Sequence, residues 1–382
     1  MRFIFIHPEG NHLNNPSLYE VERLVVRNKG EVIFLPGDVK YGGRVVGFGY
    51  RVLFWVFLRC YFWLPRLFLG LLVFLLNFRR LRDIASSDAI VGVDNLGLVQ
   101  ASVLASFFRK PLFFFSFEIM FADELGGARK KIEIKSCANV RAWFVQDGFR
   151  ADLLKKENCL RGEPVLVPLG NAGFPLGANR RLRDELGVPV DKKVMILVGS
   201  IEEWAGAPAL IESFCHGVDD DWCFILHGRY GVDRLEWYAQ LSERNRGRIF
   251  ISSVPRDFDS MADIFSGVDV GLAFYVPKSG HPFLGKNIEN IGLSSGKIST
   301  YLRHGVPVIT NVHGELAKLI DIYGAGKVVS GVGDLCLALN DISPEMRNGA
   351  SQLFQDVFDF RNYEKEVFES LCSVKRNCKK QG

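Results

Sequence analysis

Short apolar runs alternate with longer stretches of mixed polarity along the amino-terminal half of the chain. Such runs predict buried strands, and the stretch from Leu18 to Val26 predicts a helix that Asn28–Lys29–Gly30 ends. Continuous apolar strands separated by helices are typical of a parallel sheet that is covered on both faces. The predicted strands are Phe3–Ile6, Glu31–Leu35, Ala89–Val93, Pro111–Phe115, Ala142–Val145 and Val165–Pro168.

The same pattern restarts after a stretch rich in glycine and proline, Gly170 to Asn179, where we place a domain boundary. Two successive units of this kind predict an α/β protein with two Rossmann-like domains, residues 1–169 and 170–346, and a cleft between them. Ligands of such sheets bind outside the carboxyl ends of the strands. The predicted strands of the second domain are Val194–Val198, Cys223–Leu226, Arg248–Ile251, Val268–Ala273 and Pro307–Thr310.

The segment from Val52 to Phe78 stands apart because it is strongly apolar and aromatic, yet interrupted by Arg59, Pro65 and Arg66. A spanning helix needs about 20 mostly apolar residues, and a charge near its centre costs several kcal/mol. Flanking arginines and tryptophans favour a pair of helices lying in the membrane interface, so we expect membrane association over residues 51–82. A buried core or oligomer contact and a true spanning helix are the alternatives.

The amino-acid composition adds information mainly about the charge around this apolar segment. Of the 382 residues, 48% are hydrophobic, enough for two cores, and the net charge of +4 gives no indication of a nucleic-acid binder. No cysteine pair has zinc-ligand spacing, and the opening residues resemble a strand rather than a signal peptide. The basic residues gather instead around the apolar segment, at Arg44, Arg51, Arg59, Arg66, Arg79, Arg80 and Arg82.

The motif richest in chemistry is GLSSGKISTYLRHGVPVIT, from Gly292 to Thr310. A loop of glycine and serine opens an amphipathic helix there, and the helix leads through Pro307 into a strand. Exposed backbone N–H groups and the positive end of the helix dipole favour an anion, to which Lys297 adds a full charge. The alternative is an ordinary helix cap with a surface lysine.

This motif resembles the donor-binding helix of family 4 glycosyltransferases and their relatives. RFIFIHPEGN followed by KGEVIFLP resembles the opening of that family, VMILVGSIEEWAGAPALIESF its nucleotide-binding domain, VDVGLAFY the strand before the donor loop, and FQDVFDFRNYEKEVFESL its terminal helices. The resemblance spans most of the chain. It implies a GT-B fold, with parallel sheets facing a cleft and C-terminal helices, residues 347–382, that cross back to the first domain.

Two departures from the family pattern concern charge. Aligned on HGVPVIT, the two glutamates usual around the donor helix are replaced by Gly292 and Thr300. Aligned on ENIGL, Glu289 matches the first, but Lys297 takes the place of the second. The strand is the firmer anchor, and with it the chain resembles the branch that has Ser-x-Lys at the phosphate site. Ser200 and Ala205 stand where many relatives have Arg and Lys.

The resemblance nevertheless implies a donor site and an acceptor loop. Glu118, after the strand that ends at Phe115, is the candidate acid/base residue, with a helix first-turn carboxylate as the alternative. Asp123 and Glu124 are interpreted as solvated charges, and a metal role for Asp219–Asp221 is disfavoured. Contacts to substrate are considered for His7, His281, Asn287 and Asn290, with turn or loop structure as the alternative. The predicted donor site is Gly199, Arg229, Ser294, Ser295, Gly296, Lys297 and Thr300, and the predicted acceptor loop is Gly10, Asn11 and His12.

The implied activity is a hexosyltransferase that moves a sugar from a nucleotide-sugar donor to a lipid-linked glycan acceptor in cell-envelope synthesis. It is expected to need no metal or other cofactor, and to act peripherally on the cytoplasmic face of an anionic plasma or inner membrane, without nucleic acid. A nucleotide-sugar epimerase on the same fold and a catalytically inactive membrane-bound scaffold are the rival interpretations.

Overall fold

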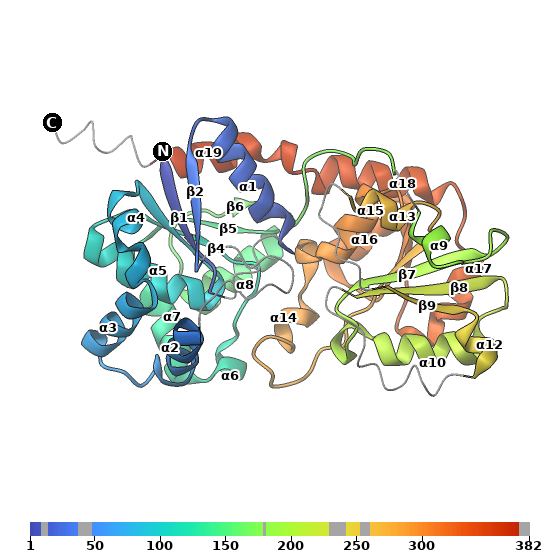
Figure 1. The fold of residues 1–382 in the computed structure, drawn as a ribbon, viewed down its shortest axis with the longest axis horizontal. Coiled ribbons are helices and arrows are strands. Elements are labelled where there is room, and N and C mark those ends of the chain that lie inside the picture. The colour runs from blue at the N-terminus through green and yellow to red at the C-terminus, as the bar shows by residue number, and fades with distance from the viewer. Residues whose placement is uncertain (9–13, 37–47, 179–180, 229–241, 253–259, 374–382) are drawn as a thin grey trace. The chain divides into compact units, whose positions relative to one another are not determined.

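The computed structural model describes residues 1–382 except 9–13, 37–47, 179–180, 229–241, 253–259 and 374–382. It divides into two compact units. The first domain comprises Met1–Leu169, Ser279–Asn287 and Phe360–Gly382, and the second comprises Gly170–Lys278 and Ile288–Asp359. Each contains one parallel sheet with helices on both faces, as the sequence predicts (Figure 1).

The sheet of the first domain has six parallel strands in the order β2-β1-β3-β4-β5-β6. Chain order therefore reverses between β1 and β3, which makes this pair the topological switch point of the sheet. The strands are β1 (Arg2–Ile6), β2 (Glu31–Leu35), β3 (Ala89–Val93), β4 (Leu112–Phe115), β5 (Val140–Val145) and β6 (Val165–Leu166).

Alternate residues of these strands build two different core layers, because successive side chains of a strand point to opposite faces. Ile4, Phe114 and Val145 belong to the layer that packs against α3, α5 and α8. On the opposite face the rings of Phe115 and Phe144 stack with centroids 4.0 Å apart. The helices of this domain are α1 (Pro16–Arg27), α2 (Phe48–Cys60), α3 (Arg66–Leu76), α4 (Leu81–Ser86), α5 (Asp94–Phe108), α6 (Ala122–Leu125), α7 (Gly127–Cys137), α8 (Gly148–Asn158) and α19 (Glu364–Cys372).

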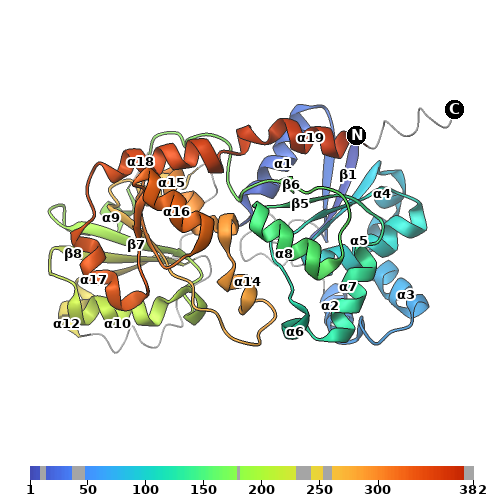
Figure 2. The same cartoon turned by 180° about the vertical axis from the view of Figure 1, so that it is seen from behind.

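The last helix, α19, packs beside α1 in the first domain (Figure 2). Arg27 and Glu364 form an ion pair at 2.5 Å across these two helices. Val367 and Leu371 of α19 are fully buried. The last helix therefore returns to the first domain as expected, but residues 347–359 belong to the second domain, so the return begins later than predicted.

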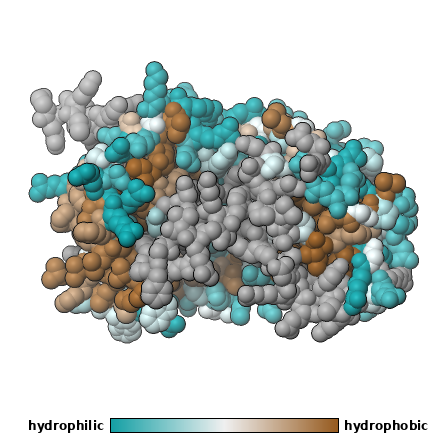
Figure 3. Space-filling view, viewed as in Figure 1, coloured by the Kyte–Doolittle hydropathy of each residue, from teal (hydrophilic) through white to brown (hydrophobic). Residues whose placement is uncertain are grey.

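The apolar segment forms two separate helices, α2 and α3, because Pro65 begins a new helix rather than continuing the old one. One side of the pair lies in the core, where Phe57, Val73 and Leu76 are buried. The other side is exposed: Trp63 is 76% and Leu67 80% accessible. Among the described helices, none combines the length and the apolar character that crossing a bilayer requires. Figure 3 shows apolar surface gathered over this part of the first domain.

The sheet of the second domain has the order β12-β11-β10-β7-β8-β9, also parallel throughout. Numbered within the domain this is 3-2-1-4-5-6, the order of dinucleotide-binding sheets, with its switch point between β7 and β10. Strand β12 was not predicted. The strands are β7 (Lys193–Gly199), β8 (Trp222–Gly228), β9 (Ile249–Ser252), β10 (Val270–Ala273), β11 (Val308–Thr310) and β12 (Gly326–Val328).

Helices α10 and α17 pack together on one face of this sheet, and α15 and α18 pack together on the other. The α-helices are α9 (Leu182–Glu185), α10 (Ala207–Gly217), α12 (Glu243–Arg246), α13 (Ala262–Phe265), α14 (Lys286–Glu289), α15 (Gly296–Arg303), α16 (Gly314–Tyr323), α17 (Leu335–Asn340) and α18 (Met346–Leu353). Short turns of other helical types lie at Phe78–Arg80, Glu203–Ala205, Gly292–Ser294, Val332–Asp334, Phe354–Phe358 and Phe360–Asn362.

The two strands at the switch point of the second domain separate early. Strand β10 pairs with β7 only through Val270↔Met195 and Gly271↔Ile196. Beyond these pairs the hydroxyl of Tyr301, from α15, bonds to the backbone of both strands in place of strand-to-strand hydrogen bonds. Its hydroxyl accepts from the Val198 N–H (3.1 Å) and lies 3.3 and 3.0 Å from the carbonyls of Ile196 and Leu272.

Gly271 makes room for this ring, because a Cβ there would lie 2.5 Å from the Tyr301 ring carbons. Burial raises the pKa of the Tyr301 hydroxyl, so it stays protonated and can donate. The hydroxyl therefore fixes α15 to both strands of the switch point.

His304 follows the last turn of α15, and the Nε2 atom of its ring is buried. Its ring lies 4.6 Å from the ring of Phe265, centroid to centroid. Burial first, and the nearby Arg303 charge second, lower the pKa of His304 to about 3. The folded protein therefore holds this imidazole neutral at pH values where the unfolded chain protonates it.

Replacing Tyr301 with Phe should lower the free energy of unfolding by roughly 1–3 kcal/mol, because it leaves buried backbone groups of β7 and β10 without their partner. Denaturant unfolding measures this loss. Tyr323→Phe is the matched control, since that hydroxyl bonds only to Asp356 near the surface. Equal effects of the two changes would contradict the role assigned to Tyr301.

His304 should make the protein less stable in acid. Its folded pKa is depressed, so the unfolded state binds more protons between about pH 6.5 and 3, and stability is lost as pH falls through that window. Between pH 7 and 5 the loss is about 2 kcal/mol. In a His304→Gln variant, the change in unfolding free energy over this interval should be smaller by that amount; an unchanged pH slope would refute the assignment.

Candidate functional site

The first candidate site lies at the switch point of the second domain, where the carboxyl ends of β7 and β10 separate. Strand β7 ends at Gly199, whose φ of +89° suits glycine and strains other residues. Strand β10 leads into Tyr275, whose backbone N–H and C=O both bond to the Asn311 side chain at 2.8 Å. The amino end of α15 joins this edge, because Tyr301 fixes the helix there.

The start of α15 has the features of an anion site. Ser295 is its N-cap, and its buried hydroxyl accepts from the Ile298 N–H at 3.1 Å. The same hydroxyl bonds to the hydroxyl of Tyr275. Gly296 and Lys297 form the first turn, where backbone N–H groups have no partner inside the helix. This end of the helix therefore offers N–H donors and a positive dipole.

The Lys297 ammonium lies at the same place, within reach of Gly199. A Cβ at Gly199 would lie 3.6 Å from Cε of Lys297. The ammonium is 4.8 Å from the ring centroid of Trp204 and 6.0 Å from that of Tyr275. These aromatic faces hold the cation at the helix start by cation–π attraction.

The structure brings several predicted donor residues together: Gly199, Ser295, Gly296 and Lys297 share this edge, and Ser294 is buried just before the N-cap. Thr300 lies one turn further along, and its hydroxyl donates to the Gly296 carbonyl at 2.7 Å within its own helix. Arg229, and the predicted acceptor residues Gly10, Asn11 and His12, lie outside the described residues.

The second candidate site lies at the switch point of the first domain. His7 follows β1, Asp94 follows β3, and Glu118 follows β4 by a short loop. These three side chains line one small pocket, whose wall also includes Asn95 and Phe283. Titratable groups at the carboxyl edge of a parallel sheet are placed where ligands of such sheets bind.

Asp94 holds the Glu118 loop in place. Its Oδ1 accepts from the backbone N–H groups of Phe117 (2.7 Å) and Glu118 (2.9 Å). Asp94 has a φ of +51°, a left-handed conformation that is uncommon outside glycine. Such conformations persist where the surroundings enforce them and concentrate at functional sites.

Arg150, from α8, holds the same loop from the other side. It is completely buried, and it donates to the carbonyl of Phe117 (2.7 Å) and to the side chain of Gln146 (3.0 Å). Burial lowers the pKa of Arg150 to about 10, against the opposing effect of Asp147, Asp94 and Glu118. The guanidinium therefore stays charged at neutral pH, next to the Glu118 loop.

The segment Ser279–Asn287 belongs to the first domain, although it follows β10 of the second in sequence. Glu124 accepts the Lys286 backbone N–H at 3.0 and 3.1 Å, and the Lys286 ammonium pairs with Asp123. Asn287 accepts the Ile119 N–H at 2.9 Å. Asp123 is exposed, as expected of a solvated charge, and Glu124 is half-buried, but both carboxylates also bind this segment.

Other polar residues noted in the sequence have structural partners. The Nδ1 of His281 accepts from the N–H groups of Phe283 (3.2 Å) and Leu284 (3.1 Å), which is turn structure. Asp220, in the acidic triplet, forms an ion pair with Arg248 at 2.9 Å.

Sequence reasoning did not identify Trp204, Tyr275, Asp94 or Arg150 as parts of these sites. The first two lie in the stretches that carry the family resemblance, but their side chains meet Lys297 only through the fold. For the site in the first domain, the available sequence signal was an aspartate, Asp94, directly after the strand Ala89–Val93.

Comparison with models of known protein families gives no match, and comparison with curated protein sequences gives none either. Solved structures match along almost the whole chain. HepE of Anabaena in complex with UDP and glucose has a TM-score of 0.65 and 16% identity, covering 98% of this chain and 100% of that one. Sucrose-phosphate synthase of Thermosynechococcus elongatus has a TM-score of 0.69 and 13% identity, covering 98% and 99%.

A candidate UDP-N-acetylglucosamine 2-epimerase from Listeria monocytogenes is also similar, with a TM-score of 0.55, 10% identity and 97% and 96% coverage. At these identities the likeness concerns the fold. Two parallel six-stranded sheets flanked by helices, matched over nearly full length by glycosyltransferase structures, show that this chain has the GT-B fold of two Rossmann-like domains.

Proposed function

We propose that this protein is a glycosyltransferase that takes a sugar from a nucleotide-sugar donor. The observation that carries the proposal is the position of Lys297 and the start of α15 at the switch point of the second sheet. N–H donors, a helix dipole and a fixed ammonium there suit the two negative phosphates of a nucleotide diphosphate. HepE, with the same fold, binds UDP and glucose.

The chemistry of transfer explains why these groups belong at that place. When the bond from the sugar to the diphosphate breaks, negative charge grows on the leaving oxygen. Donors already aimed at that oxygen stabilise the transition state without reorganising. Lys297 and the first N–H groups of α15 therefore act as the leaving-group stabiliser, and the Trp204 and Tyr275 rings keep the ammonium in place when no phosphate is bound.

The first domain is proposed to hold the acceptor. Glu118 is placed on a loop that Asp94, Arg150 and Asn287 hold rigid. A fixed carboxylate in a pocket with His7 suits deprotonation of an acceptor hydroxyl in an inverting transfer. Rigid support of this kind is what general base catalysis demands, because proton transfer needs the base within hydrogen-bond reach.

We further propose that the acceptor is a lipid-linked glycan and that the protein works on the cytoplasmic face of a membrane. Exposed Trp63, Leu67 and Phe68 on and before α3, next to the arginines of residues 51–82, support this. Aromatic and cationic side chains together favour the interface of an anionic bilayer. A soluble epimerase has no use for such a surface.

Turnover of UDP-glucose, with other UDP- and GDP-sugars as a panel, tests the donor site. Lys297→Ala should lower kcat/KM by roughly 10²–10³, the effect of removing one such electrostatic group. Lys318→Ala, an exposed lysine on α16, is the matched control and should leave turnover unchanged. Interconversion of sugar epimers without transfer would favour the epimerase, and absence of both binding and turnover would favour the scaffold.

Glu118→Gln tests the proposed base. In an inverting enzyme it should lower kcat by roughly 10²–10⁴ and abolish the fall of kcat/KM at acid pH that reports a carboxylate in the free enzyme. Glu212→Gln, an exposed carboxylate on α10 of the second domain, serves as the comparison. Activity within a few-fold of wild type would exclude Glu118 as the base.

A further inference from the structure

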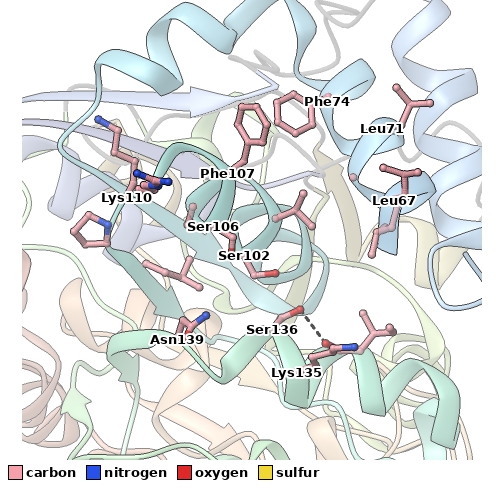
Figure 4. Close-up of a pocket in the computed structure, with 18 of the residues that line it drawn as sticks. Leu67, Leu71, Phe74, Ser102, Ser106, Phe107, Lys110, Lys135, Ser136 and Asn139 are labelled. Atoms are coloured by element: carbon pink, nitrogen blue, oxygen red, sulfur yellow. Dashed lines mark hydrogen bonds between the residues drawn. The ribbon is translucent and has the colours of Figure 1, made fainter. Parts of the chain in front are cut away.

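A large groove lies between α3, α5 and α7 of the first domain (Figure 4). Its volume of about 1090 Å³ is slightly above the roughly 300–1,000 Å³ of common small-molecule sites. Leu67, Leu71 and Phe74 of α3 line one side, and Phe107 of α5 packs edge-on against Phe74 with ring centroids 4.6 Å apart. The groove is thus an extended apolar channel open to the surface.

One end of the groove is positively charged. Four cations line it, and among the residues that the structure describes no acidic one does. Lys110 donates to the carbonyl of Ser87 at 2.6 Å, and Arg141 donates to the carbonyl of Ser373. The side chains of Arg109 and Lys135 have neither a hydrogen bond nor an ion pair to any described residue. This end therefore suits an anionic group attached to an apolar chain.

The groove is separate from the candidate site of the same domain. Lys110 and Leu112, at the start of β4, line the groove, whereas Glu118 follows the end of that strand. A strand of four residues separates the two by roughly 13 Å. A molecule lying in the groove is thus at the amino edge of the sheet, away from the reacting groups.

We propose that this groove binds one acyl chain of an anionic bilayer phospholipid, with the phosphate held by Arg109, Lys110, Lys135 and Arg141. Exposed Leu67 and Leu71 on its rim would face the hydrocarbon of the same leaflet. The proposal goes beyond the proposed membrane association, which it presumes, because it assigns a defined lipid site. It also explains the absence of acidic residues from the lining.

Gly70 offers a direct test, because it lines the groove and a Cβ there meets nothing within 4 Å. Gly70→Trp fills the channel while adding apolar surface. The probe is monomeric dodecyl phosphate, compared with dodecyl maltoside and inorganic phosphate. We expect wild type to bind the alkyl phosphate most tightly, and Gly70→Trp to lose this binding although its surface is more apolar. Equal affinity for the maltoside, or unchanged binding by Gly70→Trp, would overturn the proposal.

A second pair of variants tests the charged end without touching the channel. Arg109→Asn combined with Lys135→Gln should weaken alkyl phosphate binding roughly tenfold or more, since each cation near an anionic lipid contributes measurably. Asn tolerates the left-handed backbone of Arg109, whose φ is +53°. Lys131→Gln, exposed on the same helix as Lys135, is the control and should bind as wild type does. Equal weakening in the control and the double variant would refute the site.

Vesicles separate failure of this site from failure of the proposed function. Cosedimentation with phosphatidylcholine vesicles, with and without phosphatidylglycerol, reports membrane association. Binding to the mixed vesicles that Gly70→Trp weakens supports the lipid site, whereas vesicle binding without alkyl phosphate binding overturns it alone. The donor-dependent turnover lost in Lys297→Ala remains the separate measure of the transferase.

Discussion

The geometry of the second domain depends on one hydroxyl group. At the switch point of this sheet β10 and β7 pair at only two positions, so the backbone groups beyond these pairs need other partners. Tyr301 meets those groups from α15. Since Lys297 lies one turn before Tyr301 on the same helix, the bond that closes the sheet also places the ammonium. Gly271 is required for the same reason, as no other residue leaves space for the ring.

The first domain carries a different polar group at its switch point. Its switch point lies between β1 and β3, and Asp94, directly after β3, bonds to two N–H groups of the neighbouring loop. The cost is a backbone conformation that strains a residue with a side chain, of order 1–2 kcal/mol. In this conformation Asp94 restrains the loop that carries the Glu118 carboxylate. In each domain, one polar side chain at the switch point ties neighbouring segments together.

Local sequence signals predicted the strands and the order of the two domains, because apolar runs and glycine-proline breaks act over a few residues. Strand β12 was not predicted because Gly326–Val328 is short and contains Lys327. Trp204 and Tyr275 were not predicted as site residues because they lie in separate loops that only the fold brings close to Lys297. The same holds for Lys286 with Asp123 and Glu124, which are distant in sequence. For α2 and α3, composition indicated an apolar surface, but which side enters the core depends on neighbours such as α5.

The chain passes between the domains after Leu169, Lys278, Asn287 and Asp359, so neither domain is one continuous stretch. A ribosome therefore releases the strands of the first domain long before it releases α19, which covers α1 and carries Val367 and Leu371 into the core. Domains fold in the order of their synthesis when their sequences are contiguous. Here the apolar face that α19 covers stays open until the whole second domain has been synthesised.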